Sequence, residues 1–271
     1  MPYTDYVYID HQWKRDSKYR ITHLINLIHS FQEHIYIYQI RETTHAERDA
    51  RISRYQILTQ HALKYKHQII MTAHTKTDRL ETFFQQLFRG TSMEGITSLT
   101  EFNQIHKRIF ILRPLLNINR TETYWFCRKF SLPIWSDISN YNNKIYRNRV
   151  RYELIPYLNL YFNKRIAENI CSFLKISNME NEYVKQSALK MYLLSRHNKY
   201  TALNYKLIQK QHYSIQARTL YIFIYHNFNK LIDKNTVYEF INHLNNYPAE
   251  NKIIQYNQLK INFYNNWIYI E

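Results

Sequence analysis

Glycine is almost absent from this sequence, with two residues in 271. A phosphate-cradling loop of the Walker or dinucleotide type needs several glycines, because its backbone approaches the phosphates closely and adopts positive φ angles. Gly90 and Gly95 lie together in one short segment. Neither kind of loop is therefore encoded in these 271 residues.

Cysteines and long apolar runs are also scarce. Cys127 and Cys171 show neither a CxxC nor a metal-ligand spacing, so we expect packed thiols in a reducing compartment. No stretch approaches the roughly 18 apolar residues that span a membrane, and the first residues, MPYTDYVYIDHQWK, lack the apolar core of a signal peptide. The sequence predicts no membrane partner.

Acidic residues are few relative to basic ones. Lys and Arg number 37 against 21 Asp and Glu, a net charge of +16 that is spread along the chain. This excess favours a polyanionic partner, although charge alone does not separate nucleic acid from acidic lipid. The 26 tyrosines beside two glycines suggest the amino-acid drift of an AT-rich genome, such as a plastid's or that of an AT-rich bacterium.

Apolar residues alternate between strand and helix spacing in the first part of the chain. Strands are expected at 6–10, 35–40, 68–72 and 108–112, and helices from Ser17, over 47–65, from Leu80 and over 119–130. Gly90 sits where a helix would end. The pattern predicts an α/β domain over residues 1–163, with a mostly parallel sheet, flanking helices and ligands at the carboxyl ends of the strands.

The pattern changes after residue 163. Helical spacing covers 166–194, 215–228 and, behind Asn235, 237–244, without intervening strands. The last segment, 259–270, alternates in the manner of a closing strand or hairpin. We expect a smaller, mainly helical domain over residues 164–271.

The densest polar cluster is AHTKTDRLETFFQQLFRGTSMEG. His74 would end a strand, and Asp78 and Glu81 would share one face of the helix that follows. Such a set could bind a metal ion, bind an ammonium group or exchange protons. Alternatively, the two carboxylates merely complement the helix dipole, and Arg89 merely ends the helix.

Two further segments concentrate arginine. In AERDARISRY, Glu47, Arg51 and Arg54 would lie near one helix face aimed at the same sheet end, although surface ion pairs explain them equally well. The segment LPIWSDISNYNNKIYRNRVRYELIPYL suits phosphate contacts, or else a solvated loop and helix start. Its candidate residues are Asp137, Asn140, Arg147, Asn148, Arg149 and Arg151.

Together these motifs resemble the tRNA(Ile)-lysidine synthetases of the N-type ATP pyrophosphatase, or PP-loop, group. The resemblance covers about residues 5–158. The matching motifs, in order, are Asp10-His11, ExxARxxRY at 47–55, AHxxxDxxET at 73–82 with Arg89-Gly90, RPLL at 113–116 with Arg120 and Glu122, DxSN at 137–140, and RNRxRxxLxPxL at 147–158.

The resemblance implies an adenine nucleotide alpha hydrolase-like fold and an ATP-dependent carbon–nitrogen ligase. ATP, with Mg²⁺, would adenylate the wobble cytidine of an isoleucine tRNA with a CAU anticodon. The side-chain amine of free L-lysine would then displace AMP. Asp78 and Glu81 would hold the lysine ammonium or Mg²⁺, His74 would assist proton transfer, and Arg54 would stabilise the leaving phosphate.

The same resemblance implies a tRNA surface and a place in the cell. Arg89, Arg147, Asn148, Arg149 and Arg151 would bind the tRNA with help from the basic C-terminal domain, while Asp137 and Asn140 would form a turn at the site. The enzyme would work in the plastid stroma, or in the cytoplasm of an AT-rich bacterium. A homodimer is an open alternative to a monomer.

The sequence departs from the family at two points. Thr77 stands where many members have the first of two aspartates. Members also carry a first strand and an SGGxDS phosphate loop upstream of the Asp10-His11 motif, so a truncated gene model is the expected explanation of its absence. Two alternatives stay open: a non-catalytic tRNA-binding remnant, and another PP-loop enzyme such as a thiolase.

Overall fold

The computed structural model describes residues 4–12, 17–40, 47–132, 145–246, 253–256 and 259–270. The chain divides into two compact units, Met1–Ser172 and Phe173–Glu271. The sequence placed the division after residue 163, just before the long helix α8 (Ile166–Ser195). The boundary between the two units falls a few residues later, in the first part of that helix. Within the described ranges, every helix is too short or too polar to cross a lipid bilayer.

The first unit alternates strands and helices along its N-terminal half. Its elements before α8 are β1 (Tyr6–Asp10), α1 (Ser17–Ser30), β2 (Ile35–Gln39), α2 (Glu47–Lys64), β3 (Ile69–Met71), α3 (Lys76–Phe88), α4 (Met93–Ile96), β4 (Phe102–His106), β5 (Ile109–Leu112), α5 (Arg120–Lys129), α6 (Tyr146–Arg149), the π-helix η2 (Val150–Leu154) and α7 (Ile155–Tyr161).

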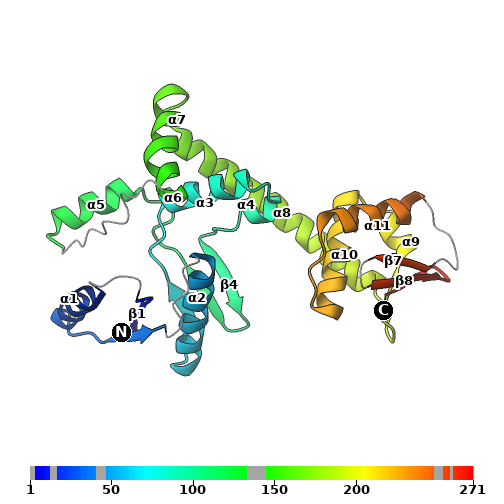
Figure 1. Ribbon diagram of the computed structural model, residues 1–271, viewed down its shortest axis with the longest axis horizontal. Coiled ribbons are helices and arrows are strands. Elements are labelled where there is room, and N and C mark those ends of the chain that lie inside the picture. The colour runs from blue at the N-terminus through cyan, green and yellow to red at the C-terminus, as the bar shows by residue number, and fades with distance from the viewer. Residues whose placement is uncertain are drawn as a thin grey trace. The chain divides into compact units, whose positions relative to one another are not determined.

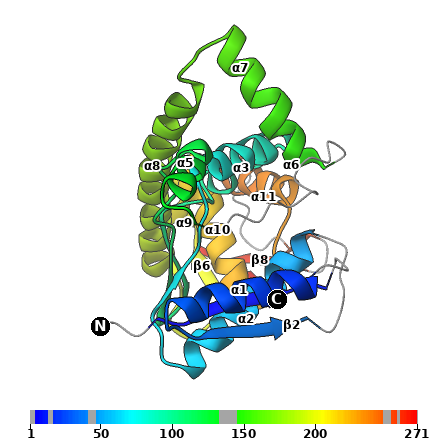
Figure 2. The same ribbon diagram turned by 90° about the vertical axis from the view of Figure 1, so that its left-hand side faces the viewer.

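Two sheets form in this unit. β1 pairs with β2 in parallel, starting at Tyr6 opposite Ile35, and α1 connects them and lies alongside the pair (Figure 1 and Figure 2). The second sheet has the order β3-β5-β4, with β3 and β5 parallel and β4 antiparallel to β5. All four predicted strands are confirmed to within one residue at each end. β4 was not predicted, because its exposed sequence FNQIH carries no apolar run.

Helix α2 packs on the second sheet. Ala62 of α2 forms a small buried core with Ile70 of β3 and with Ile109 and Ile111 of β5. The alternating apolar positions of a strand and one apolar stripe of a helix explain this packing. β3 ends at Met71, and the residues that follow its carboxyl end lead into α3.

The segment from α6 to α7 is one helix with a wide turn. Ile155 donates its backbone N–H to the carbonyl of Val150, a π-type bond, and Pro156 follows immediately. A proline inside a helix has no N–H and its ring clashes with the carbonyl four residues earlier. A π turn directly before Pro156 lets the helix continue past it.

The second unit is mainly helical but contains a sheet. Besides the end of α8, its elements are β6 (Ala202–Asn204), α9 (Tyr205–Gln209), α10 (Tyr213–Phe228), α11 (Lys234–Asn246), β7 (Ile253–Tyr256), β8 (Leu259–Tyr264) and β9 (Trp267–Ile270). The predicted helices are confirmed, and the alternating end of the chain is a hairpin of β8 and β9.

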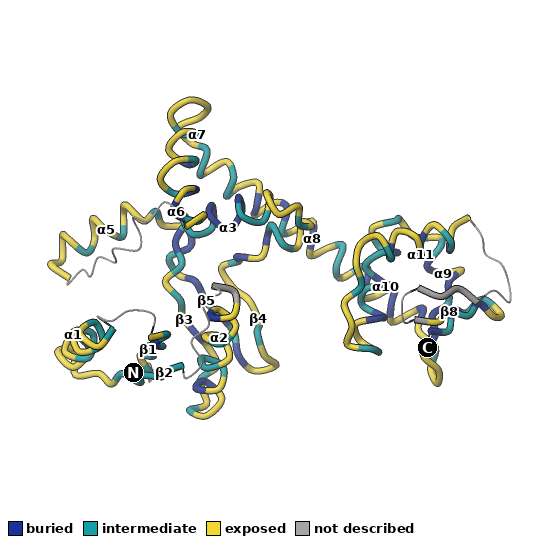
Figure 3. Tube along the Cα trace, in the orientation of Figure 1, coloured by how far each residue is buried: buried dark blue, intermediate teal, exposed yellow. Residues whose placement is uncertain are grey.

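The unpredicted strands β6 and β7 complete an antiparallel sheet of order β6-β9-β8-β7. α10 and α11 cover it with a buried apolar core that includes Phe223, Ile241 and Ile268 (Figure 3). A three-residue strand such as β6 is too short to show an alternating pattern, so only its pairing with β9 identifies it.

Candidate active site

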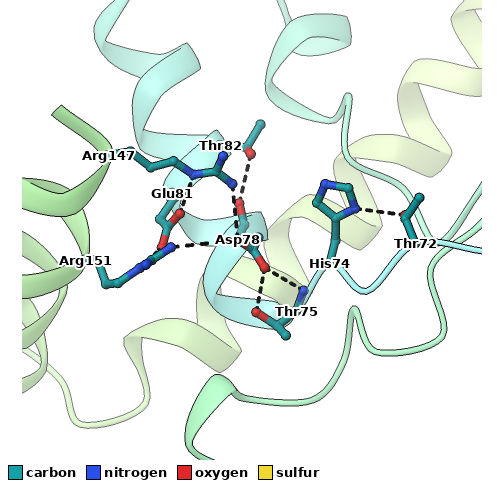
Figure 4. Close-up of polar contacts among 8 residues, drawn as sticks. All are labelled: Thr72, His74, Thr75, Asp78, Glu81, Thr82, Arg147 and Arg151. Carbon is teal, nitrogen blue, oxygen red and sulfur yellow. Dashed lines mark hydrogen bonds and ion pairs between the residues drawn. The ribbon is translucent and has the colours of Figure 1, made fainter. Parts of the chain in front are cut away.

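The site is built around the turn from β3 into α3. Thr75 is the N-cap of α3 and has extended backbone angles. Its backbone N–H and its hydroxyl both donate to Oδ2 of Asp78, each at 2.8 Å (Figure 4). Asp78 is the third residue of the helix, where a carboxylate satisfies an otherwise unpaired N–H and interacts favourably with the helix dipole. The local sequence therefore fixes the orientation of Asp78.

Two arginines from the distant α6–η2 segment approach the carboxylates of α3. Arg147 donates from Nε to Oε2 of Glu81 at 2.5 Å and from Nη2 to Oδ1 of Asp78 at 3.2 Å. Arg151 donates from Nε to the other oxygen of Glu81, Oε1, also at 2.5 Å (Figure 4). Arg147 and Arg151 are four residues apart and so share one helix face. We call these four residues the carboxylate–arginine network.

Burial is uneven within this network. The side chain of Glu81 is fully buried, that of Arg151 is 10% exposed, and those of Asp78 and Arg147 are 18% and 27% exposed. A buried carboxylate is tolerated when charged donors satisfy its oxygens. Glu81 meets this condition with one guanidinium on each oxygen, whereas Asp78 retains some access to solvent.

The geometry does not fit a magnesium ion between Asp78 and Glu81, a site that the sequence had suggested. Both oxygens of Glu81 and both oxygens of Asp78 already accept hydrogen bonds. Mg²⁺ needs carboxylate oxygens together with several retained water molecules in an octahedral shell. Two guanidinium groups occupy that space, so the pair leaves no room for the ion and its water ligands.

His74 lies in a cationic environment. Burial and then the charge of Arg113 lower its pKa from 6.5 to about 4, with further lowering by Arg51 and Arg147, while Asp78 opposes them. Its Nδ1 lies 2.9 Å from the hydroxyl of Thr72. The imidazole is therefore neutral at physiological pH and able to accept a proton.

The carboxylate of Asp78 stays ionised. Burial by itself would raise its pKa, but the two hydrogen bonds from Thr75 and the charge of Arg147 outweigh burial and lower the pKa overall. For Arg151, burial opposes the charge, yet the hydrogen bond and the charge of Glu81 raise its pKa. Asp78 and Arg151 are thus both held in their charged forms.

Arg54 does not join this network. Its Nη2 lies 3.2 Å from Nε2 of His11, directly after β1. Arg51, one turn earlier on α2, is close enough to His74 to lower the pKa of that imidazole. The first half of α2 therefore faces the carboxyl ends of both β1 and β3, as its sequence suggested, with Arg51 nearer the candidate base.

Arg113 was not recognised as a site residue from the sequence. It is 3% exposed, it donates to the backbone carbonyl of Thr100 at 2.7 Å, and its Nε is buried without a partner among the described residues. It follows β5, the strand that pairs in parallel with β3. The signal that could have identified it is its place at a strand's carboxyl end within the RPLL motif.

The three regularly spaced arginines have different environments. Unlike Arg147 and Arg151, Arg149 is exposed and pairs with Glu153 at 3.4 Å. Asn148, which lies between Arg147 and Arg149 in the sequence, is buried. Arg89 is exposed at the far end of α3, where Gly90 adopts a φ of +65° and closes the helix. Asp137 and Asn140 lie outside the described residues.

A groove of about 380 Å³ runs beside Arg149. Its walls are largely apolar and come from the end of α3 and from the α6–α7 helix. The lining residues are Phe88, Tyr146, Arg149, Val150, Glu153, Leu154 and Tyr157. The rings of Phe88 and Tyr146 meet edge to face at 6.4 Å, and both side chains remain exposed.

Comparison with known proteins identifies the family. The PP-loop domain family matches residues 4–158. A chloroplastic tRNA(Ile)-lysidine synthase from Gracilaria tenuistipitata var. liui is 47% identical over 98% of the chain and 82% of that protein. The chain belongs to the tRNA(Ile)-lysidine synthase family. The family's chloroplastic member from Pyropia yezoensis is 37% identical over 82% of the chain and 67% of that protein.

Further comparisons agree with this family and its fold. A tRNA(Ile)-lysidine synthase from Nostoc sp. is 37% identical over 66% of the chain and 52% of that protein. Among solved structures, the U34-tRNA thiolase NcsA from Methanococcus maripaludis, with its 4Fe-4S cluster, aligns with a TM-score of 0.52 at 12% identity. The alignment covers 64% of the chain and 62% of NcsA. The predicted family and the adenine nucleotide alpha hydrolase-like fold are confirmed.

Replacing Glu81 should destabilise the fold. In Glu81→Gln, two partly buried guanidinium groups lose the fully buried carboxylate that they share, and we expect the free energy of unfolding to fall by about 3–5 kcal/mol. Urea denaturation measures this change. The matched control is Glu153→Gln, which removes an exposed pair with Arg149 and should cost about 0.5 kcal/mol or less. Equal stabilities of the two variants would contradict a central role for Glu81.

The depressed pKa of His74 should make stability pH-dependent. Above pH 6.5 the imidazole is neutral whether the chain is folded or unfolded. Between pH 6.5 and about 4 only the unfolded chain binds the proton, so stability is lost as the pH falls. Melting temperatures between pH 7 and 4.5 should fall less steeply for His74→Gln than for the wild type. Parallel curves would show that the imidazole is not held neutral.

Proposed function

We propose that the chain is a tRNA(Ile)-lysidine synthase that acts on the CAU-anticodon isoleucine tRNA. ATP transfers AMP to the carbonyl oxygen of the wobble cytidine and releases pyrophosphate. The side-chain amine of free lysine then forms the new carbon–nitrogen bond as AMP leaves with the oxygen. The product, lysidine, reads AUA. The observation that carries this proposal is the 47% identity to a named family member over 98% of the chain.

His74 is the candidate general base of the second step. A neutral imidazole can take the proton that the attacking amine loses, and the low pKa of His74 keeps it neutral. Thr72 engages Nδ1 at 2.9 Å, so Nε2 would be the nitrogen that takes up the proton. Arg113, Arg51 and Arg54 supply positive charge at the same strand ends and would stabilise the phosphate of the leaving AMP.

Asp78 and Glu81 have separate roles in this proposal. Asp78 is partly exposed, and its contact with Arg147 is the longer one at 3.2 Å. It is therefore the carboxylate that would bind the lysine ammonium. Glu81 is a positioning residue, because its two arginine contacts fix the α6–η2 segment against α3. Mg²⁺ would accompany the ATP phosphates away from this pair.

The tRNA surface would include Arg149, Arg89 and the aromatic groove. Single-stranded bases stack on exposed aromatic rings, and arginines contact the neighbouring phosphates. Phe88, Tyr146 and Tyr157 provide such rings beside Arg149. Arg147, Asn148 and Arg151 would act indirectly, by holding the helix that presents Arg149. The net charge of +16 supports contact with RNA over both units.

Two other functions predict different results. A thiolase would need a reactive thiol, but burial raises the pKa of Cys171 and so disfavours its thiolate. A tRNA-binding remnant would bind tRNA without reaction. The plastid stroma is the proposed location, because several relatives are chloroplastic proteins. A homodimer stays a prediction.

The proposed reaction predicts incorporation of labelled lysine into a CAU-anticodon isoleucine tRNA in the presence of ATP. Asp78→Asn should reduce the rate by about 100-fold or more, since it removes the charge that binds the ammonium, and should leave tRNA affinity unchanged. Asp49→Asn, an exposed position on α2, is the matched control and should keep full activity. Tight tRNA binding with no lysine incorporation by the wild type would favour the remnant, and sulfur incorporation would favour the thiolase.

The proposed RNA surface predicts that Arg149→Ala weakens tRNA binding and lowers the slope of log affinity against log salt by about one. The loss is expected because an exposed arginine beside the groove contacts a phosphate. Arg108→Ala, in the exposed turn between β4 and β5, is the matched control and should keep the wild-type slope. Titration of labelled tRNA at several salt concentrations measures both. Identical slopes in the two variants would exclude Arg149 from the interface.

A further inference from the structure

A second cluster of ionisable side chains lies at the other end of α2. His61, in the last turns of α2, lies about 10 Å further along the helix than Arg54. Its Nε2 is 3.0 Å from Oδ2 of Asp5, and Nε2 of His67 is 2.7 Å from the same oxygen. Asp5 directly precedes β1, and His67 shortly precedes β3. The cluster therefore sits at the amino ends of the strands, opposite the candidate active site.

The three side chains are withdrawn from solvent. Those of Asp5 and His61 are 3% and 4% exposed, and that of His67 is 20% exposed. The two imidazole rings are nearly parallel, with centroids 6.0 Å apart. The rings of Tyr36 and Tyr65 pack against His61 at 4.8 and 4.6 Å. A buried carboxylate between two imidazoles, inside an aromatic shell, is a low-dielectric setting in which a cation binds strongly.

We propose that Asp5, His61 and His67 form a binding site for Zn²⁺. One ligand atom from each residue lies within 4.8 Å of the other two. In a tetrahedral zinc site, bonds of about 2.0–2.1 Å place neighbouring ligand atoms about 3.3 Å apart. The two nitrogen–oxygen distances of 3.0 and 2.7 Å are slightly shorter than this. Small side-chain shifts would therefore admit the ion, with water as the fourth ligand.

The surroundings of His61 support metal binding through Nε2. The hydroxyl of Tyr38 lies 2.8 Å from Nδ1 of His61. When Nε2 binds a metal, Nδ1 carries the ring proton and needs an acceptor, which the tyrosine oxygen provides. Each imidazole would move its proton from Nε2 to Nδ1, so neutral rings bind the ion without oxidation or reduction. The donor set of two imidazoles and one carboxylate suits zinc better than magnesium.

The position indicates a structural role. In the part of the chain that the structure describes, β1-β2 and β3-β5-β4 are separate sheets with no strand pairing between them. Asp5 belongs to the start of the first sheet, His67 to the start of the second, and His61 to the helix that packs on the second. A bound zinc ion would join all three, and so would stabilise the catalytic unit without touching the reacting groups.

The proposal is tested by metal binding to the purified full chain. After removal of metal with a chelator, calorimetric titration with Zn²⁺ should show one site per chain, and a thermal melt should shift to higher temperature with added zinc. Asp5→Asn and His67→Ala should each lose this site. Tyr38→Phe should weaken zinc binding by about tenfold, because it removes only the acceptor for Nδ1 of His61.

His29→Ala, an exposed histidine on α1, is the matched control and should bind zinc like the wild type. His67 is the preferred histidine to replace, since it is more exposed than His61 and its loss is less disruptive to folding. Circular dichroism of each variant checks that it is folded. Wild-type protein without stoichiometric zinc binding, or equal binding by His67→Ala and His29→Ala, would overturn the proposal. Neither result bears on lysine incorporation, which is measured separately.

Discussion

The buried carboxylate of Glu81 is the interaction on which the candidate active site depends. A fully buried charge is costly unless charged donors satisfy it, and Glu81 receives one guanidinium on each oxygen. These two contacts connect residues that are 66 and 70 positions apart in the sequence. They hold the α6–η2 segment against α3, and thereby decide which face of that segment is turned toward solvent. The exposure of Arg149 and its place in the aromatic groove follow from this arrangement.

The charges of the site are divided between two regions. In the network, two carboxylates and two guanidiniums balance one another. Around His74, the nearby cations outnumber the anions, since Arg113, Arg51 and Arg147 oppose only Asp78. The balanced charges of the network hold the α6–η2 segment against α3. The excess of positive charge around His74 lowers the pKa of this candidate base and would attract phosphates. Asp78 belongs to both regions and is partly exposed, which suits a residue that exchanges an arginine for a substrate ammonium.

Helix α2 runs from the carboxyl ends of the strands to their amino ends. Arg51 and Arg54 in its first half face the carboxyl ends of β3 and β1, where ligands bind in folds of this kind. His61 near its end meets Asp5 and His67 at the amino ends. Because the candidate catalytic groups gather at one end and the proposed zinc ligands at the other, metal binding would change stability while leaving those groups unaltered.

The sequence by itself determined the family, the order of most strands and helices, and the turn that orients Asp78, because motif order, apolar spacing and capping residues act over a few positions. It also placed His74 at a strand's carboxyl end. Only the tertiary structure decided that Arg147 and Arg151 bind the two carboxylates of α3. It also decided that, of the three regularly spaced arginines, Arg149 alone is exposed. Finally, it brought Arg113 close enough to His74 to lower the pKa of the imidazole. It also revealed β4, β6 and β7, whose short or polar segments acquire strand form through pairing. Such contacts join residues far apart in the chain, and their energies depend on burial, which no local pattern encodes.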